Sequence, residues 1–187
     1  MIDNTKYIYW IWPDFFVDDE LSQLQKHLKN INMKGEPSED PAPGKKFTNS
    51  YVFRYENISY LPSITRLHKN IPYINQYHFG YDIYNLNEID EVLLNKYSSE
   101  QKHHYDWHID QHDSHMLDFK FTVLANISNN YTGGEFELNA NGNPFTVNEF
   151  KPGAVIMFRS NVQHKVNPVL SGSRETLSFF IRGPRWR

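Results

Sequence analysis

The segment HHYDWHIDQHDSH, residues 103–115, concentrates side chains that can bind a metal ion. It holds five of the chain's nine histidines and three aspartates. His108 and Asp110 are separated by one residue, and on a β-strand residues i and i+2 point to the same face. A third ligand from a distant strand would complete a three-ligand face, and His164 is the only histidine after residue 115.

Two imidazoles and one carboxylate would leave three positions of an octahedral metal ion open. This arrangement is associated with non-heme Fe(II) oxygenases. A helical alternative places His104, His108 and His112 at i, i+4 and i+8. A zinc protease of the H-E-x-x-H kind requires Glu directly after its first histidine, but Tyr105 and Ile109 stand at those places. The helical alternative therefore lacks its general base.

A polar, solvated loop without a metal is the remaining alternative, because an isolated H-x-D tripeptide is a weak signal. We interpret the other histidines of the segment as loop or rim residues: His103, His104, His112 and His115. The order of motifs downstream of this segment favours the metal site over the bare loop.

Arg174 follows His164 by ten residues and precedes the apolar run TLSFFIRG. A buried arginine is costly unless it pairs with an anion, and its planar guanidinium fits a carboxylate through two parallel hydrogen bonds. Arg174 and Thr176 alternate onto one strand face, so Thr176 could donate a second hydrogen bond to the same anion.

The elements that must position these residues are predicted from periodicity. Leucines recur at helical spacing in residues 18–31, where Asp18 or Asp19 can cap the helix. A second helix around residues 64–71 should end at Pro72. Between them, residues 34–46 contain three prolines and two glycines, which predicts a mobile loop.

From about residue 81, short β-branched and aromatic runs alternate with turn signals. Asn141-Gly142 sits between two such runs and is a strong hairpin signal. At least six strands follow one another without intervening helices, so a sandwich or barrel is expected and a doubly wound α/β fold is not. The predicted strands include 119–128, 151–158, 164–170 and 176–183.

The composition sets limits on the kind of protein. The chain has 187 residues, a net charge of −3 and no cysteine, which predicts one domain without disulfides or thiolate metal sites. The charge gives no reason to expect nucleic acid or an anionic membrane as a partner. We expect a cytoplasmic protein, since the first residues do not read as a signal peptide and no run is long enough to span a membrane.

The chain resembles the Fe(II)/2-oxoglutarate-dependent dioxygenases, specifically their prolyl 4-hydroxylase-like branch. The matching pieces run in order: YDWHID, YTGGEFEL, KPGAVIMF and HKVNPVLSGSRETLSFFIRGP, with PDFFVDDELSQLQKHL resembling the lead-in helix. The resemblance implies a mainly β fold with flanking helices around a double-stranded β-helix, or jelly-roll, core. Within one domain spanning 1–187, residues 1–80 would supply helical support and a loop, and 81–187 the core.

The resemblance also implies roles for single residues. His108, Asp110 and His164 would bind iron, Arg174 would bind the distal carboxylate of 2-oxoglutarate, and Tyr97 would border this cosubstrate. The stretch SSEQKHH after Tyr97 departs from the branch, being longer than the usual connection and without its glycine. In this branch a segment in the position of residues 34–46 closes over the peptide substrate.

The implied reaction consumes O2 and converts 2-oxoglutarate to succinate and carbon dioxide while a substrate C–H bond is hydroxylated, with ascorbate as a further reductant. A prolyl residue in a peptide or protein is the expected substrate. The alternatives are a free amino acid or other small metabolite, or a non-catalytic jelly-roll binding module.

Overall fold

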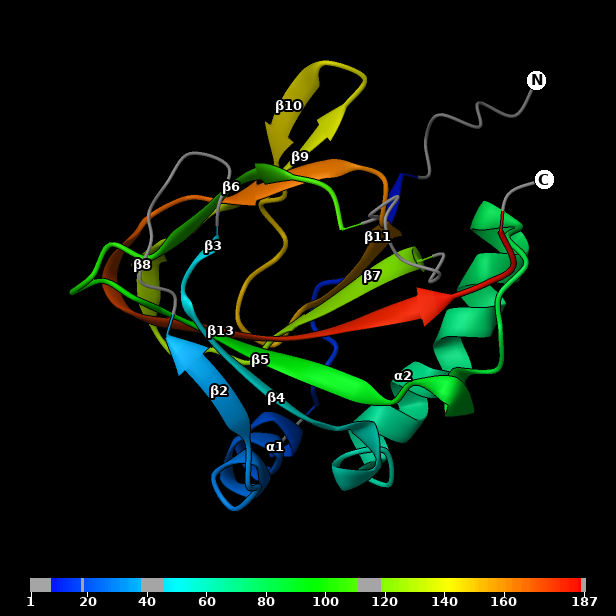
Figure 1. The fold of residues 1–187 in the computed structure, drawn as a ribbon, viewed down its shortest axis with the longest axis horizontal. Helices are drawn as coiled ribbons and strands as arrows, with labels where there is room; N and C mark the ends of the chain where they lie inside the picture. The colour runs from blue at the N-terminus through cyan, green and yellow to red at the C-terminus, as the bar shows by residue number, and fades with distance from the viewer. Residues whose placement is uncertain (1–7, 18, 38–45, 111–118, 186–187) are drawn as a thin grey trace.

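The computed structural model describes residues 8–17, 19–37, 46–110 and 119–185. Two antiparallel sheets face each other and enclose the interior of the molecule (Figure 1). This confirms the prediction of a mainly β fold with flanking helices and a jelly-roll core.

The larger sheet has eight strands: β1 (Tyr9–Trp12), β2 (Lys34–Pro37), β4 (Asn49–Arg54), β5 (Glu91–Ser98), β7 (Phe119–Asn126), β8 (Tyr131–Gly133), β11 (Val155–Arg159) and β13 (Val169–Arg182). Their order is β1-β11-β7-β13-β5-β4-β2, with β8 paired to the first part of β13. The smaller sheet has the order β10-β9-β12-β6-β3. Its strands are β3 (Lys46–Phe47), β6 (His104–His108), β9 (Phe136–Ala140), β10 (Asn143–Thr146) and β12 (Gln163–Val166).

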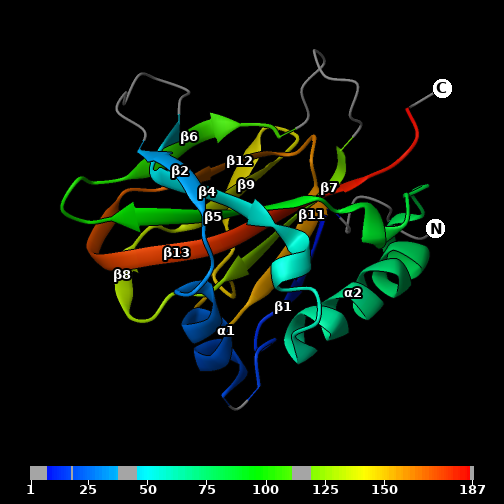
Figure 2. The same cartoon turned by 60° about the horizontal axis from the view of Figure 1, so that its bottom comes forward.

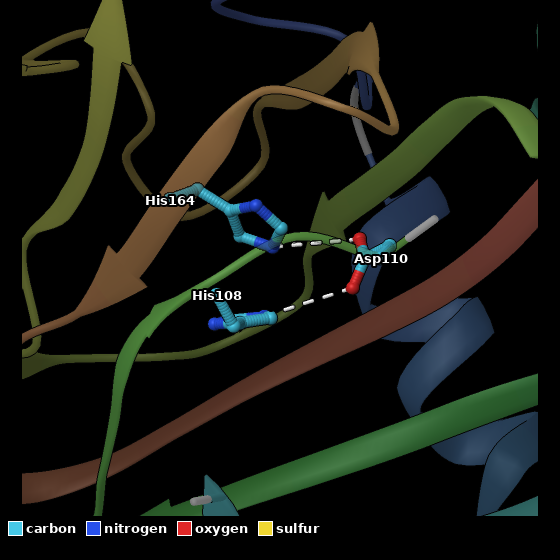
Figure 3. Close-up of side chains that lie close together, drawn as sticks. All are labelled: His108, Asp110 and His164. Atoms are coloured by element: carbon cyan, nitrogen blue, oxygen red, sulfur yellow. Dashed lines mark ion pairs between the residues drawn. The ribbon is translucent and has the colours of Figure 1, made fainter. Parts of the chain in front are cut away.

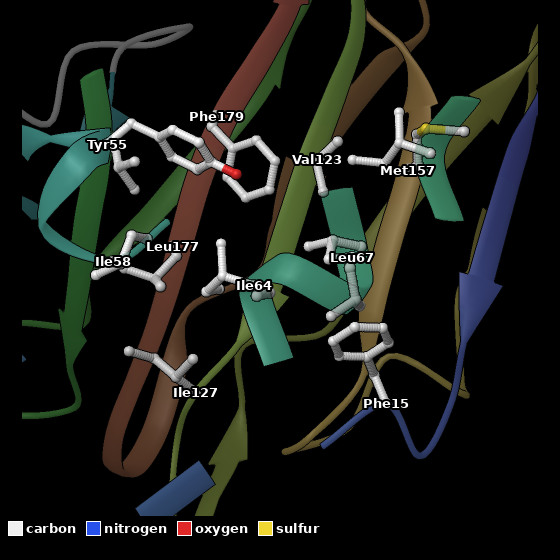
Figure 4. Packing of buried hydrophobic residues seen from close by; sticks show 14 of the residues in the cluster. Phe15, Tyr55, Ile58, Ile64, Leu67, Val123, Ile127, Met157, Leu177 and Phe179 are labelled. Atoms are coloured by element: carbon white, nitrogen blue, oxygen red, sulfur yellow. The ribbon is translucent and has the colours of Figure 1, made fainter. Parts of the chain in front are cut away.

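Two helices, α1 (Glu20–Leu28) and α2 (Pro62–Ile74), lie on the outer face of the larger sheet (Figure 2). Their apolar faces pack on alternate residues of the central strands, among them Val123, Leu177 and Phe179 (Figure 4). The residues between these, such as Leu124, point into the space between the sheets and join a second core cluster. The period-2 alternation of a strand thus separates helix-facing residues from site-facing residues.

The connecting turns are short. Tyr55–Asn57 and Leu86–Glu88 form 3₁₀ turns, and Asn75–Phe79 forms a π-helical turn directly after α2. Asn141 and Gly142 have φ values of 54° and 87°, as the predicted hairpin between β9 and β10 requires. None of the helices that the structure describes is long and apolar enough to cross a membrane.

Two local predictions about the first 80 residues are wrong. Pro72 lies inside α2 instead of ending it, because the residues beyond it continue into the π-helical turn and the chain turns away only at Gly80, which has φ of 68°. Of the two predicted capping residues of α1, Asp19 occupies the N-cap position without a side-chain hydrogen bond, and Asp18 lies outside the described residues. The Glu20 carboxylate accepts the Val17 N–H.

The second correction concerns the predicted loop at 34–46. Its first four residues form β2, which pairs in register with β4, and Lys46 opens β3. Edge strands tolerate proline and glycine, because one of their edges needs no ladder hydrogen bonds. Residues 38–45 lie outside the described residues, so the predicted closure of this segment over a substrate stays untested. The part of the chain before residue 81 supplies four strands in addition to the helices.

Candidate active site

Strand register brings the three predicted metal ligands together. His108 is the last residue of β6, and Asp110 follows it by two residues, just past the strand end. His164 lies on β12, directly opposite His108 in the pairing of β12 with β6. The Nε2 atoms of His108 and His164 lie 3.6 and 3.4 Å from the two carboxylate oxygens of Asp110 (Figure 3). One ligand atom from each residue lies within 4.8 Å of the other two.

Backbone carbonyls orient both imidazoles. His108 Nδ1 lies 2.7 Å from the Asp106 carbonyl oxygen, and His164 Nδ1 lies 3.0 Å from the Val162 carbonyl oxygen. A carbonyl can only accept, so each Nδ1 carries the hydrogen and donates it. The lone pair is then on Nε2, the atom that faces the other ligands, which is how metal-binding histidines are held in many proteins.

The carboxylate has its own support from the larger sheet. Thr122 on β7 donates its hydroxyl hydrogen to Asp110 Oδ2 at 2.6 Å, and Ser160 Oγ lies 3.0 Å from the same threonine oxygen. The Asp110 N–H donates to the Ser160 carbonyl. Asp110 is therefore fixed although it lies beyond the end of its strand.

The electrostatics keep the imidazole of His108 neutral. Burial lowers the pKa of His108 to about 4; His164 acts in the same direction and Asp110 opposes it. A neutral imidazole is the form that binds a metal. Two imidazole nitrogens and one carboxylate oxygen, converging and supported from behind, fit Fe(II) and also Mn(II), Co(II) or Zn(II).

Among the described residues, the other histidines of the motif are not part of this group. His104 was predicted to be a loop or rim residue, but it lies on β6, and its Nδ1 donates to the Lys102 carbonyl oxygen. His103 was predicted to lie in a loop or at the rim; it lies in the connection between β5 and β6, but it is fully buried and not at the rim, and its Nδ1 accepts the Ser98 N–H. His112 and His115 lie outside the described residues.

A narrow cavity of about 60 Å³ extends from the three ligands between the two sheets. This is room for a few water molecules. Arg174, Thr176 and Tyr97 line this cavity together with the ligands. The predicted site residues of β5 and β13 therefore share one pocket with the candidate metal centre.

Arg174 is buried without a matching anion among the residues that the structure describes. Its side chain is 1% exposed, and its Nε and Nη2 atoms have no hydrogen-bond partner there. The guanidinium carbon lies 5.2 Å from the ring centre of Tyr97 and 5.7 Å from that of Phe150. Aromatic faces reduce the cost of a buried cation, but two unpartnered N–H groups still call for an acceptor.

Tyr97 and Thr176 border this guanidinium. Tyr97 is paired with Arg174 in the register of β5 and β13, and burial raises the pKa of its phenol. Thr176 is 2% exposed and follows Arg174 on the same face of β13. Both residues therefore lie where they could contact a carboxylate bound to Arg174.

Sequence reasoning missed several polar residues of this pocket, among them Lys46, Asn95 and Thr122. Lys46 stands at the end of the segment that was interpreted as a loop. Asn95 and Thr122 are single polar residues within apolar strand patterns, and that interruption of the pattern was the only signal they offered.

Comparison with known proteins places these features in a family. Residues 92–182 match the model of the 2OG-Fe(II) oxygenase superfamily. A PKHD-type hydroxylase from Synechococcus sp. (strain CC9605) is 29% identical over 89 residues, which are 46% of this chain and 39% of the relative. The chain thus matches well under half of that relative's length.

Solved structures share the fold over nearly the whole chain. A prolyl-4-hydroxylase from Pseudomonas putida superposes with a TM-score of 0.70 at 15% identity, covering 98% of this chain and 96% of that one. A prolyl hydroxylase from Trichoplax adhaerens, in complex with a hypoxia inducible factor peptide fragment, gives 0.67 at 17% identity, covering 94% and 84%.

The matched residues run from β5 through β13 and include His108, Asp110, His164 and Arg174. They carry the converging ligand atoms and the buried guanidinium described above. In these residues the chain is similar to the 2OG-Fe(II) oxygenase superfamily.

Proposed function

We propose that this protein is an Fe(II)- and 2-oxoglutarate-dependent dioxygenase that hydroxylates a C–H bond, with a prolyl residue of a peptide or protein as its substrate. One observation carries the proposal: a cavity has a converging His-Asp-His ligand set in one part of its lining and a buried, unmatched arginine in another. Binding of 2-oxoglutarate requires a metal ion, which the His-Asp-His set could hold, and a partner for its distal carboxylate, which the arginine could supply.

The chain's own residues divide the work. His108, Asp110 and His164 would hold Fe(II), and Thr122 would keep Asp110 aimed at it. Arg174 would bind the distal carboxylate of 2-oxoglutarate, with Thr176 and Tyr97 beside it. When bound, iron and 2-oxoglutarate together supply the oxidation of the substrate C–H bond by O2. The two sheets shield the reacting atoms from water.

The prolyl substrate is the finer part of the proposal. Its support is the likeness to the prolyl-4-hydroxylase and the peptide-bound prolyl hydroxylase above. Free amino acids and other small metabolites form the competing class, because one fold serves many substrates.

A coupled assay tests both parts. The purified protein receives Fe(II), ascorbate and 2-oxoglutarate, and succinate is measured across proline-containing peptides and free amino acids, with mass spectrometry for one added oxygen atom. We expect succinate and an oxygenated peptide to form together. Oxygenated free amino acid with untouched peptide would exclude the prolyl peptide substrate. A protein that neither binds 2-oxoglutarate nor forms succinate would be a binding module, and the dioxygenase proposal would fall.

A further inference from the structure

The same pocket contains a second cation that the family motifs do not include. Lys46, the first residue of β3, lines the cavity with His108, Asp110 and Arg174. It stands opposite Tyr105 in the pairing of β3 with β6. The Tyr105 ring stacks on the His108 ring at 3.4 Å, and the Lys46 ammonium lies 5.9 Å from the centre of the Tyr105 ring. Lys46 is thus held on the side of the pocket where the metal ligands lie.

A chain of hydrogen bonds fixes the direction of this ammonium. Lys46 Nζ lies 2.5 Å from Asn95 Oδ1, and Ser50 donates to the same oxygen at 2.9 Å. Asn95 Nδ2 donates to Ser178 Oγ at 2.8 Å. The amide is therefore oriented from both ends, with its oxygen toward Lys46. Asn95 is one of the partners of this ammonium.

The register places Lys46 between the metal ligands and Arg174. Asn95, which Lys46 contacts, is paired with Thr176, and Arg174 is paired with Tyr97 two residues further along β5. In the other direction, Phe180 of β13 is paired with Thr122, the residue that holds Asp110. A ligand that reached from the metal to Arg174 would pass the Lys46 ammonium.

The electrostatic surroundings also suit an anion. Burial lowers the pKa of Lys46 to about 8, and the charge of Asp110 opposes this shift. A desolvated ammonium gains more from a carboxylate than an exposed one does. Two cations at different depths, Lys46 and Arg174, match the two carboxylates of a short dicarboxylic acid.

We propose that Lys46 binds the carboxylate of 2-oxoglutarate that lies nearer the metal, while Arg174 binds the distal one. This inference rests on the proposed function, because it assigns a residue to the cosubstrate of that reaction. It makes Lys46 a binding residue contributed by the N-terminal part of the chain, outside the matched residues 92–182. The residues of β13 alone would then hold only one end of the cosubstrate.

The assignment is tested by removing one carboxylate from the ligand and, separately, by substituting the side chains of Lys46 and Arg174. Binding to the Mn(II)-loaded full chain is measured by calorimetry without substrate or turnover, using 2-oxoglutarate and 2-oxopentanoate, which lacks the distal carboxylate. We expect Lys46→Met to weaken both ligands by a similar factor of at least about ten, the scale of one hydrogen bond to a charged group. Arg174→Met should weaken 2-oxoglutarate alone. Lys46→Arg should recover part of the loss.

Lys96→Met is the matched control. Lys96 is a lysine on β5 of the larger sheet, but it pairs with Glu175 at 3.3 Å and is 41% exposed, so its removal should change neither affinity. The Mn(II) affinity of Lys46→Met reports on folding of the site and should be unchanged or tighter, since a nearby positive charge is removed.

Several results would overturn the assignment. If Lys46→Met bound both oxo acids as tightly as the wild type does, Lys46 would not bind the cosubstrate. This conclusion would hold even if the variant had a higher KM for the primary substrate. Loss for 2-oxoglutarate alone would move Lys46 to the distal carboxylate. A wild-type chain that binds Mn(II) but neither oxo acid would instead remove the proposed function, and this inference with it.

Discussion

The two ends of the pocket are built in opposite ways. At the metal end, each ligand is supported from behind: carbonyls accept from both Nδ1 atoms, and Thr122 donates to Asp110. At the far end, Arg174 is buried between two aromatic rings with Nε and Nη2 unpartnered among the described residues. The side chains of the metal end are held in place without a metal ion. The guanidinium of Arg174 at the far end, by contrast, has a charge that is balanced only when an anion binds.

This difference suggests different contributions to stability. Hydrogen-bonded neutral imidazoles cost the fold little when no metal is bound. A buried guanidinium without an anion costs more, because its desolvation is not balanced by a partner. The far end should therefore oppose folding of the free protein, while the metal end should not.

The largest effect is expected from removing a ligand at the metal end. Asp110→Ala or His164→Ala should abolish turnover and lower Mn(II) affinity by more than about a hundredfold, since a ligand matters more than its support. The protein should remain folded, as judged by circular dichroism. Full activity of either variant would remove that residue from the ligand set.

A change at the far end should separate binding from stability. Arg174→Ala should raise the 2-oxoglutarate requirement about a hundredfold or more, because a carboxylate loses a bidentate charged partner. Arg174→Lys should restore only part of it. Arg174→Met should leave Mn(II) affinity intact and stabilise the ligand-free protein by roughly 1 to 4 kcal/mol in denaturant unfolding. Destabilisation by Arg174→Met would contradict the picture of an uncompensated charge.

The support of the carboxylate should have an intermediate effect. Thr122→Val keeps the side-chain shape but removes the hydroxyl that donates to Asp110 at 2.6 Å. Loss of such a partner typically lowers metal affinity about 10- to 100-fold. Thr122→Ser, which keeps a hydroxyl, is the matched control and should bind Mn(II) nearly as the wild type does. Equal affinities of all three proteins would show that Asp110 needs no such support.

The smallest effect concerns pH. The pKa of His108 is about 4 in the folded protein and about 6.5 when the chain is unfolded. Between these values the unfolded chain binds a proton that the folded chain does not, so stability is complete above about pH 6.5 and falls toward pH 4. The slope from this group is at most about 1.4 kcal/mol per pH unit.

Urea unfolding of the metal-free protein at pH 7.5, 6, 5 and 4.5 measures this dependence. His108→Gln should show a shallower decline over the same range, because glutamine does not titrate. Parallel curves for the two proteins would mean that His108 is protonated in the fold at its ordinary pH.

Local chemistry could be predicted because it depends on neighbours in the chain. The spacing of His108 and Asp110 and the alternation of Arg174 and Thr176 follow from strand geometry. The hairpin at Asn141-Gly142 follows from the φ values that those two residues tolerate. The order of the motifs was sufficient for the resemblance to the family.

Other features could not be predicted because they depend on pairing between distant segments. Residues 34–37 have the composition of a loop, yet the free edge of β4 makes them a strand. Pro72 ends many helices, but here the apolar face of α2 packs on the sheet beyond it.

The sequence by itself determined which residue types were available for a metal and a carboxylate, and on which strand faces they lie. Only the tertiary structure decided that β12 sets His164 opposite His108, that Thr122 supports Asp110, and that Lys46 enters the pocket from an edge strand. The physical reason is that strand pairing joins residues dozens of positions apart, and no local periodicity records which edge a strand will meet.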